Sequence, residues 1–281
     1  LKENNEEEDS MDAAAFGTFF HNTAEDFYRQ FIGENITASL LQQFVDKKEL
    51  LNPHVNRALE KTINELYNGG NNIDSGGMEH LLKSIVREYM VRVIKNDIKF
   101  CPFTIVNLEK KYKKTYTVNT SEGEIAFEIG GAVDRLDKIT DEQGNQILRV
   151  VDYKTGKDHG STKINDIEEM FDDSKEGSDY FRQTSLYSIA IAEDRLVNPQ
   201  HLAVAPSLYY IRNKDVGNND ATYNPIISYA GQPLSDIENI KADYEEELHK
   251  VLHSIFNKTT FDIPADLSIC NNCPFAELCQ D

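Results

Sequence analysis

The sequence contains no apolar run that approaches 18 residues, so it predicts no transmembrane helix. Its first ten residues, LKENNEEEDS, are polar and acidic, which is unlike a secretory signal peptide. We therefore expect neither membrane insertion nor secretion. Because the chain begins with Leu1 rather than Met, we also expect it to be a segment of a longer protein.

Cysteine is scarce, with 4 residues among 281. Cys101 stands alone, and the other three crowd near the C-terminus at Cys270, Cys273 and Cys279. Secreted proteins held by disulfides carry an even number of cysteines spread along the chain. The pattern here favours a cytosolic protein.

Basic residues are also few. Lys and Arg together number 29 against 48 Asp and Glu, which gives a net charge of −19. A protein that coats nucleic acid takes most of its affinity from a basic surface, so the charge argues against this function class. An enzyme with a local basic groove is still allowed, because residues 101–160 are nearly neutral. Hydrophobic residues make up 40% of the chain, enough for a large core.

The periodicity of apolar residues divides the chain. After an acidic lead-in at 1–12, which we expect to be mobile, helical spacing covers 13–32, 36–68 with a break near 52–53, and 78–97. Alternation typical of strands covers 109–118, 124–139 and 147–156. A helix at 178–194, a strand at 202–212 and a long helix at 233–257 follow. The order predicts an α/β fold with a helical region at 13–100, a core at 101–265 and a cysteine-containing tail at 266–281.

Two strands carry carboxylates where apolar residues are expected. Asp134 follows GGAV, and Asp152 follows a run of apolar residues at the end of the next strand. Adjacent hairpin strands bring such carboxylates together, which is unfavourable without a cation. Lys154 lies two residues after Asp152 and so on the same face. Two acids and a lysine suit metal-dependent phosphodiester hydrolysis. A surface hairpin with ordinary salt bridges is the alternative.

The segments GGAVDRLD and VVDYKTGK resemble the RecB-type branch of the PD-(D/E)XK nucleases. The resemblance implies a restriction-endonuclease-like core, a central mixed sheet flanked by helices. It implies that Asp134 and Asp152 bind Mg²⁺ or Mn²⁺ and are catalytic, that the Tyr153 carbonyl is a further ligand, and that Lys154 is the catalytic lysine. Arg135 and Asp137, in the same motif, are expected to support the hairpin by pairing.

Two helices extend the resemblance. FRQTSLYSIAI is similar to the following Q-x-x-x-Y helix, which implies that Gln183 and Tyr187 lie beside the metal site and the DNA. FGTFFHNTAEDFY resembles the early helix of the family, which implies that His21 is a metal ligand. The alternatives are a solvent-exposed Gln above a core Tyr, and a core His. PFTIVNLEKKY loosely resembles the segment before the first strand of the family, which often has an acidic residue near the position of Glu109. A structural role for Glu109 is the alternative.

The spacing Cys270-x2-Cys273-x5-Cys279 suits an iron–sulfur cluster or zinc. It resembles three of the four cysteines that hold a four-iron four-sulfur cluster in AddB-like nucleases. In those proteins the fourth cysteine precedes the nuclease core. None lies before residue 16 here, and Cys101 is in a different context. We expect the cluster in the intact protein and free thiols in this segment.

The resemblance implies a DNA exonuclease that acts in double-strand-break repair and recombination, as part of a larger helicase–nuclease of the AddAB or RecBCD kind. DNA and a helicase subunit or domain are the expected partners, with no membrane. Two alternatives stay open: a catalytically silent nuclease fold that serves as a scaffold for a partner, and a zinc-clasped regulatory domain. The sequence does not fix the cleavage polarity or the preference for single or double strands.

Overall fold

The computed structural model describes residues 13–67, 77–156, 162–218 and 223–258, together with 270 and 273. The acidic lead-in, most of the loop after 67 and most of the cysteine tail, including Cys279, lie outside the described residues. Among these residues, no helix combines the length and the apolarity that a membrane crossing requires.

The first part of the chain is helical, as expected. The 3₁₀ turn Lys48–Leu51 separates the helix that ends at Asp46 from the helix that begins at Asn52. A second 3₁₀ turn, Ile98–Phe100, leads into the sheet. The break expected near 52–53 is in fact the start of the third helix, where Pro53 occupies the first turn, a position that tolerates a missing N–H. The helices are α1 (Ala13–Arg29), α2 (Ala38–Asp46), α3 (Asn52–Tyr67) and α4 (Gly77–Asp97).

A mixed five-stranded sheet follows, in the order β1-β2-β3-β4-β6. Its pairs are antiparallel except for β4 and β6, which run parallel. A crossover through α6 (Ser178–Glu193) connects that parallel pair. The strands are β1 (Asn35–Ile36), β2 (Phe103–Thr120), β3 (Gly123–Thr140), β4 (Gln146–Lys154) and β6 (Val204–Tyr210).

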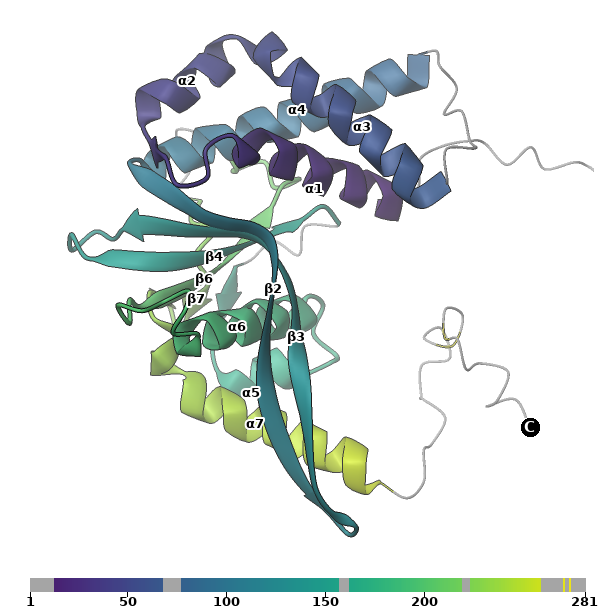
Figure 1. The fold of residues 1–281 in the computed structure, drawn as a ribbon, viewed down its shortest axis with the longest axis vertical. Helices are drawn as coiled ribbons and strands as arrows, with labels where there is room; N and C mark the ends of the chain where they lie inside the picture. The colour runs from purple at the N-terminus through teal and green to yellow at the C-terminus, as the bar shows by residue number, and fades with distance from the viewer. Residues whose placement is uncertain are drawn as a thin grey trace, which may run out of the picture.

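Helices cover the sheet on both faces, with α1–α4 on one side and α5–α7 on the other (Figure 1). A small second sheet joins β5 (Lys163–Ile164), β7 (Ser228–Tyr229) and β8 (Gln232–Pro233). The remaining helices are α5 (Ile167–Phe171), the 3₁₀ turn Ile237–Asn239 and α7 (Lys241–Asn257). This is the mixed sheet flanked by helices of a restriction-endonuclease-like core. The helix expected at 233–257 therefore starts later, because Pro233 belongs to a strand.

The β2–β3 hairpin extends well beyond the other strands of the sheet. β3 pairs with β4 only from Arg135 to Thr140, whereas it pairs with β2 along almost its whole length. The far half of the hairpin extends beside α6 and α7 (Figure 1). There Tyr116 and Val118 pack against Leu252 of α7.

Side chains of β4 alternate between the two helical layers. Val151 and Tyr153 join the apolar cluster that contains α1 and α4, and Leu148 and Val150 join the cluster that contains α6. The strand period of two therefore directs Asp152, with Lys154 after it, to the α6 face. The same alternation places Arg149 on the face of α1–α4.

That helical face contains a buried ionic network. Arg135 donates two hydrogen bonds to Asp97 at the end of α4, at 2.7 and 3.0 Å. Its Nε also lies 3.1 Å from Asp137, so the expected pairing of these two is present but is not the main one. Arg149 completes the network through Asp137 at 2.6 Å. All four side chains are 0% exposed, and Tyr28 of α1 donates to Asp97.

The network joins helices to sheet, because Asp97 and Tyr28 come from helices while the other members come from strands. Burial opposes ionisation of Asp97, but the Arg135 charge outweighs it and lowers the pKa of that carboxyl. A buried ion pair is tolerated only when both charges are present and hydrogen-bonded. Removing one partner leaves an uncompensated charge in the core.

We expect Asp97→Asn to lower the free energy of unfolding by about 3–5 kcal/mol, since it leaves the Arg135 charge buried and unpaired. Urea denaturation followed by circular dichroism measures this change. The matched control is Glu88→Gln, which removes the same charge from an exposed pair with Lys48 and should cost less than about 1 kcal/mol. Equal losses in the two variants would contradict the structural role of the network.

Candidate active site

Asp134 and Asp152 lie where β3 and β4 separate. The last paired residues of the two strands are Arg135 and Val151, and the two aspartates occupy the next position on each strand. Asp134 Oδ2 accepts a hydrogen bond of 2.7 Å from the backbone N–H of Tyr153. Asp152 is only 7% exposed. The structure thus brings the two carboxylates to one point at the end of the shared ladder.

Glu109 reaches the same point from β2. Leu108 pairs with Arg135 and Lys110 pairs with Val133, which leaves Glu109 and Asp134 level with each other. The φ angle of Glu109 is 47°, a left-handed conformation that non-glycine residues adopt rarely and at a cost of about 1–3 kcal/mol. This strained backbone interrupts the strand at the one position that faces Asp134.

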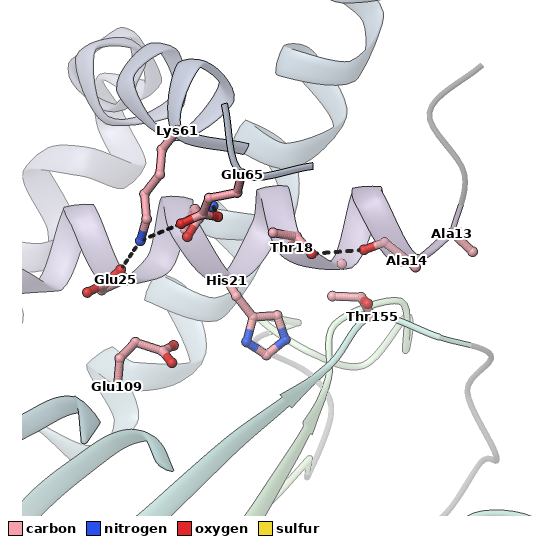
Figure 2. A pocket seen from close by; sticks show the side chains of 11 residues that line it. Ala13, Ala14, Thr18, His21, Glu25, Lys61, Glu65, Glu109 and Thr155 are labelled. Carbon is pink, nitrogen blue, oxygen red and sulfur yellow. Dashed lines mark hydrogen bonds and ion pairs between the residues drawn. The ribbon is translucent and has the colours of Figure 1, made fainter. Parts of the chain in front are cut away.

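His21 approaches from α1. Its Nδ1 lies 3.3 Å from Asp134 Oδ1, and Figure 2 shows the ring projecting from the helix toward the strands, with the Glu109 carboxylate pointing toward it. One turn earlier, a Cβ on Gly17 would lie 2.9 Å from Thr155 Oγ1. The absence of a side chain at Gly17 therefore lets α1 come close enough to β4 for His21 to reach the carboxylates.

Lys154 is held between β4 and α6. Its Nζ lies 2.7 Å from Asp152 Oδ2 and donates to Gln183 Oε1 at 2.9 Å. The Gln183 amide in turn donates to the Tyr187 hydroxyl at 2.9 Å, as expected for residues one helical turn apart. The ammonium also lies 4.3 Å from the centre of the Tyr180 ring, a cation–π distance.

Gly131 sets the distance between α6 and β3. A Cβ there would lie 2.3 Å from the Tyr187 hydroxyl oxygen. Only glycine therefore lets Tyr187 come close enough to support Gln183 and, through it, Lys154. Its neighbour Gly130 is needed for a different approach, since a Cβ there would lie 2.0 Å from the backbone oxygen of Tyr112 on β2.

The charges of the site are poorly compensated in the protein alone. Burial and then the Asp134 charge raise the pKa of Glu109 from 4.5 to about 7. Burial and then the Asp134 charge also raise the pKa of Asp152 from 3.8 to about 6, although the Lys154 ammonium opposes the rise. Burial would lower the pKa of His21, but the Asp134 carboxylate outweighs it and raises it from 6.5 to about 9.

These residues fit a divalent cation. His21, Glu109 and Asp134 each offer a ligand atom, and the three atoms lie within 4.8 Å of one another. Asp152 Oδ2 is buried and, among the described residues, has the nearby Lys154 ammonium but no well-oriented hydrogen bond. Carboxylates that repel one another across a small space, together with an imidazole, are an ordinary donor set for such an ion.

A cleft of about 540 Å³ opens beside these ligands, between α1, α3 and β2 (Figure 2). His21 and Glu109 line it together with Glu25 and Glu65. Lys61 of α3 lies 2.8 Å from Glu25 of α1, across the cleft, and 3.7 Å from Glu65, one turn further along its own helix. The cleft gives the candidate site access to the surface on its helical side.

The structure therefore brings together the side chains of Asp134, Asp152, Lys154, Gln183 and Tyr187. His21, which the sequence also indicated, reaches them from α1. The metal-ligand role of the Tyr153 carbonyl stays a prediction. Sequence reasoning left Glu109 undecided and did not find Tyr180. An acidic residue in the strand that pairs with the Asp134 strand was the available signal for Glu109.

The cysteines are only partly described. The Cys273 N–H donates to the Cys270 carbonyl at 3.1 Å, which brings these two residues together, and Cys279 lies outside the described residues. Cys101 is different: its thiol contacts the Asp97 carbonyl, and burial raises its pKa to about 12. Such a thiol is disfavoured as a thiolate ligand.

Comparison with known families agrees with this geometry. The sequence model of the PD-(D/E)XK nuclease superfamily matches residues 1–280. The chain belongs to this superfamily. A search of curated proteins finds no significant match. PD-(D/E)XK nucleases usually use Mg²⁺ or Mn²⁺, in keeping with the donor set of this site.

For this PD-(D/E)XK chain, we expect Gly131→Ala to lower the free energy of unfolding by about 1–3 kcal/mol, because the new methyl group overlaps the Tyr187 hydroxyl. Tyr187→Phe removes that hydroxyl, so the loss should be smaller in the double variant. A double-mutant cycle by urea denaturation measures the coupling. If the two changes in the free energy of unfolding were additive, the close approach of Tyr187 would not be the reason for glycine at 131.

The raised pKa values predict how pH affects the metal-free protein. A raised pKa stabilises the fold below the unfolded-state value, and this stabilisation is lost as the pH rises through the folded-state value. In EDTA, the wild type should therefore lose stability relative to Glu109→Gln as the pH rises from about 4.5 to about 7. Relative to His21→Gln, the loss should occur between 6.5 and about 9.

Urea denaturation across this pH range measures both differences. Added Mn²⁺ should reduce them, because the cation takes the place of the bound protons. Parallel stability curves for the wild type and both variants would show that the site carries no such electrostatic strain.

Proposed function

We propose that this PD-(D/E)XK chain is a Mg²⁺- or Mn²⁺-dependent deoxyribonuclease of the exonuclease type. The observation that carries the proposal is the convergence of Asp134, Asp152 and Lys154 at the end of one strand pair. The two carboxylates lie one position beyond the last paired residues, and the ammonium lies 2.7 Å from one of them. A degenerate scaffold has no need to keep these residues together.

Each residue has a definite task in phosphodiester hydrolysis. Asp134 and Asp152, with His21 and Glu109, would hold the cation, which when bound would polarise a phosphate oxygen and make water more acidic. Lys154 orients the attacking water or donates to the non-bridging phosphate oxygens, on which negative charge builds up in the transition state. The oxygen of water forms the new bond to phosphorus as the P–O bond to the leaving oxygen breaks. The proton that the water loses passes to solvent, and the leaving alkoxide takes a proton from solvent.

The orientation of Lys154 depends on its partners in α6. Gln183 accepts a hydrogen bond from the ammonium and donates one to the Tyr187 hydroxyl, which holds Gln183 in place. The ring of Tyr180 supports the ammonium from another side. These contacts fix the ammonium near Asp152 before substrate arrives, so little reorganisation is needed during the reaction.

The biological setting is also part of the proposal. The RecB-like motifs around Asp134 and Asp152 support a role in double-strand-break repair and recombination. They support a place in a larger cytosolic helicase–nuclease of the AddAB or RecBCD kind, which delivers the DNA strand. The net charge of −19 agrees with such delivery, since the chain has little basic surface with which to collect DNA itself.

The cysteine tail belongs to the same proposal. Cys270, Cys273 and Cys279 would supply three ligands of a four-iron four-sulfur cluster in the intact protein. The proximity of Cys270 and Cys273 is compatible with this role. Iron and acid-labile sulfide analysis of the intact protein tests it, and zinc in place of iron would favour a zinc clasp.

We expect purified protein to cut end-labelled DNA in Mg²⁺ or Mn²⁺ and to stop in EDTA. Asp152→Ala and Lys154→Ala should each lower the rate by about a hundredfold or more, because the first removes a proposed ligand of the cation and the second removes positive charge that stabilises the transition state. Labelled fragments on denaturing gels measure the rate and show whether cutting starts from ends.

The control is Lys113→Ala, which removes an exposed lysine that pairs with Glu128 on the same hairpin, away from the site. It should cut at the wild-type rate. Equal activity of Lys154→Ala and Lys113→Ala would refute the proposed role of Lys154. Metal-independent cutting would refute the cation site.

A further inference from the structure

A second cleft, of about 580 Å³, opens on the opposite helical layer, between α5, α6, α7 and β3. Figure 1 shows these helices stacked beside the long hairpin. Gln183 and Tyr187 line this cleft as well as supporting Lys154. A molecule in the cleft is therefore next to the group that is proposed to act on phosphate.

The walls of the cleft are apolar and partly open. Phe171, Leu186 and Leu248 are half-buried there, and Val251 is 41% exposed. These side chains come from three different helices. Its volume is in the range of about 300–1,000 Å³ that is typical of sites for small molecules. A flat, apolar group fits such walls.

The charges at the cleft do not suit a phosphate. Asp173 and Asp179 line it, and its one lining cation among the described residues, Arg182, is paired with Asp173 at 2.7 Å. An anion is therefore repelled, whereas a neutral ring is not. A nucleobase is neutral, flat and able to use the exposed Gln183 amide for hydrogen bonding.

We propose that the cleft between α6 and α7 binds an unpaired nucleobase of the nucleotide beside the scissile phosphate. This inference rests on the proposed nuclease function and specifies its substrate. The phosphate lies at Lys154, and the attached base enters the cleft. A base that is paired and stacked in a duplex cannot enter, so single-stranded DNA is the preferred substrate.

The test uses the full chain and fluorescence anisotropy in Ca²⁺. One probe is a short labelled oligothymidylate, and the other has the same backbone with abasic sites in place of the bases. The wild type should bind the oligothymidylate about tenfold more tightly, in line with the effect of base stacking on protein side chains. Val251→Trp fills the cleft and should abolish this preference.

The matched control is Ile255→Trp, the same kind of change one turn further along α7, at a side chain that is 54% exposed and outside the cleft lining. It should keep the wild-type preference. Both positions are exposed, so neither change disturbs the core. Retention of the preference in Val251→Trp, or its absence in the wild type, would overturn the proposal.

Cleavage of the oligothymidylate in Mg²⁺ separates the two proposals. If the wild type binds the base through Val251 but does not cut, the cleft is supported and the nuclease function fails. If the wild type cuts both probes equally and Val251→Trp cuts as well as the wild type, the nuclease function is supported and the base cleft is refuted.

Discussion

The pairing of Arg135 with Asp97 is the interaction on which the rest of the structure depends. It joins the end of α4 to the middle of the sheet in a region that excludes solvent, and Tyr28 ties α1 to the same carboxylate. Because the adjacent residue on β3 is Asp134, the network also fixes the strand that carries the candidate metal ligand. The helical layer and the site are therefore held by one set of charges, which is stable only when complete.

The candidate site has the opposite electrostatic character. The buried network matches each carboxylate with an arginine, whereas Glu109, Asp134 and Asp152 converge with one imidazole and one ammonium. The raised pKa values of Glu109 and Asp152 express this shortage of positive charge. The left-handed backbone at Glu109 places conformational strain at the same point. Such concentrated strain is typical of sites that are completed by a ligand.

Much of this arrangement followed from local sequence. The strand period predicted that Asp152 and Lys154 share a face, and the sheet-and-helix architecture was predicted correctly. Other features depend on distant contacts. The partner of Arg135 is Asp97, which lies 38 positions earlier in the chain, and the placement of Glu109 depends on strand register and a left-handed φ that its neighbours do not indicate. The helix expected from 233 begins only at Lys241, because Pro233 joins a small sheet.

The length of the β2–β3 hairpin has a mechanical consequence. Before Arg135, β3 pairs with β2 alone and not with β4, so Asp134 and Glu109 lie at the base of a long hairpin arm that packs against α7. Asp152 belongs to β4, whose parallel partner β6 anchors it separately. The spacing between the two aspartates thus depends on two strands that are anchored separately, β3 by the hairpin and β4 by β6.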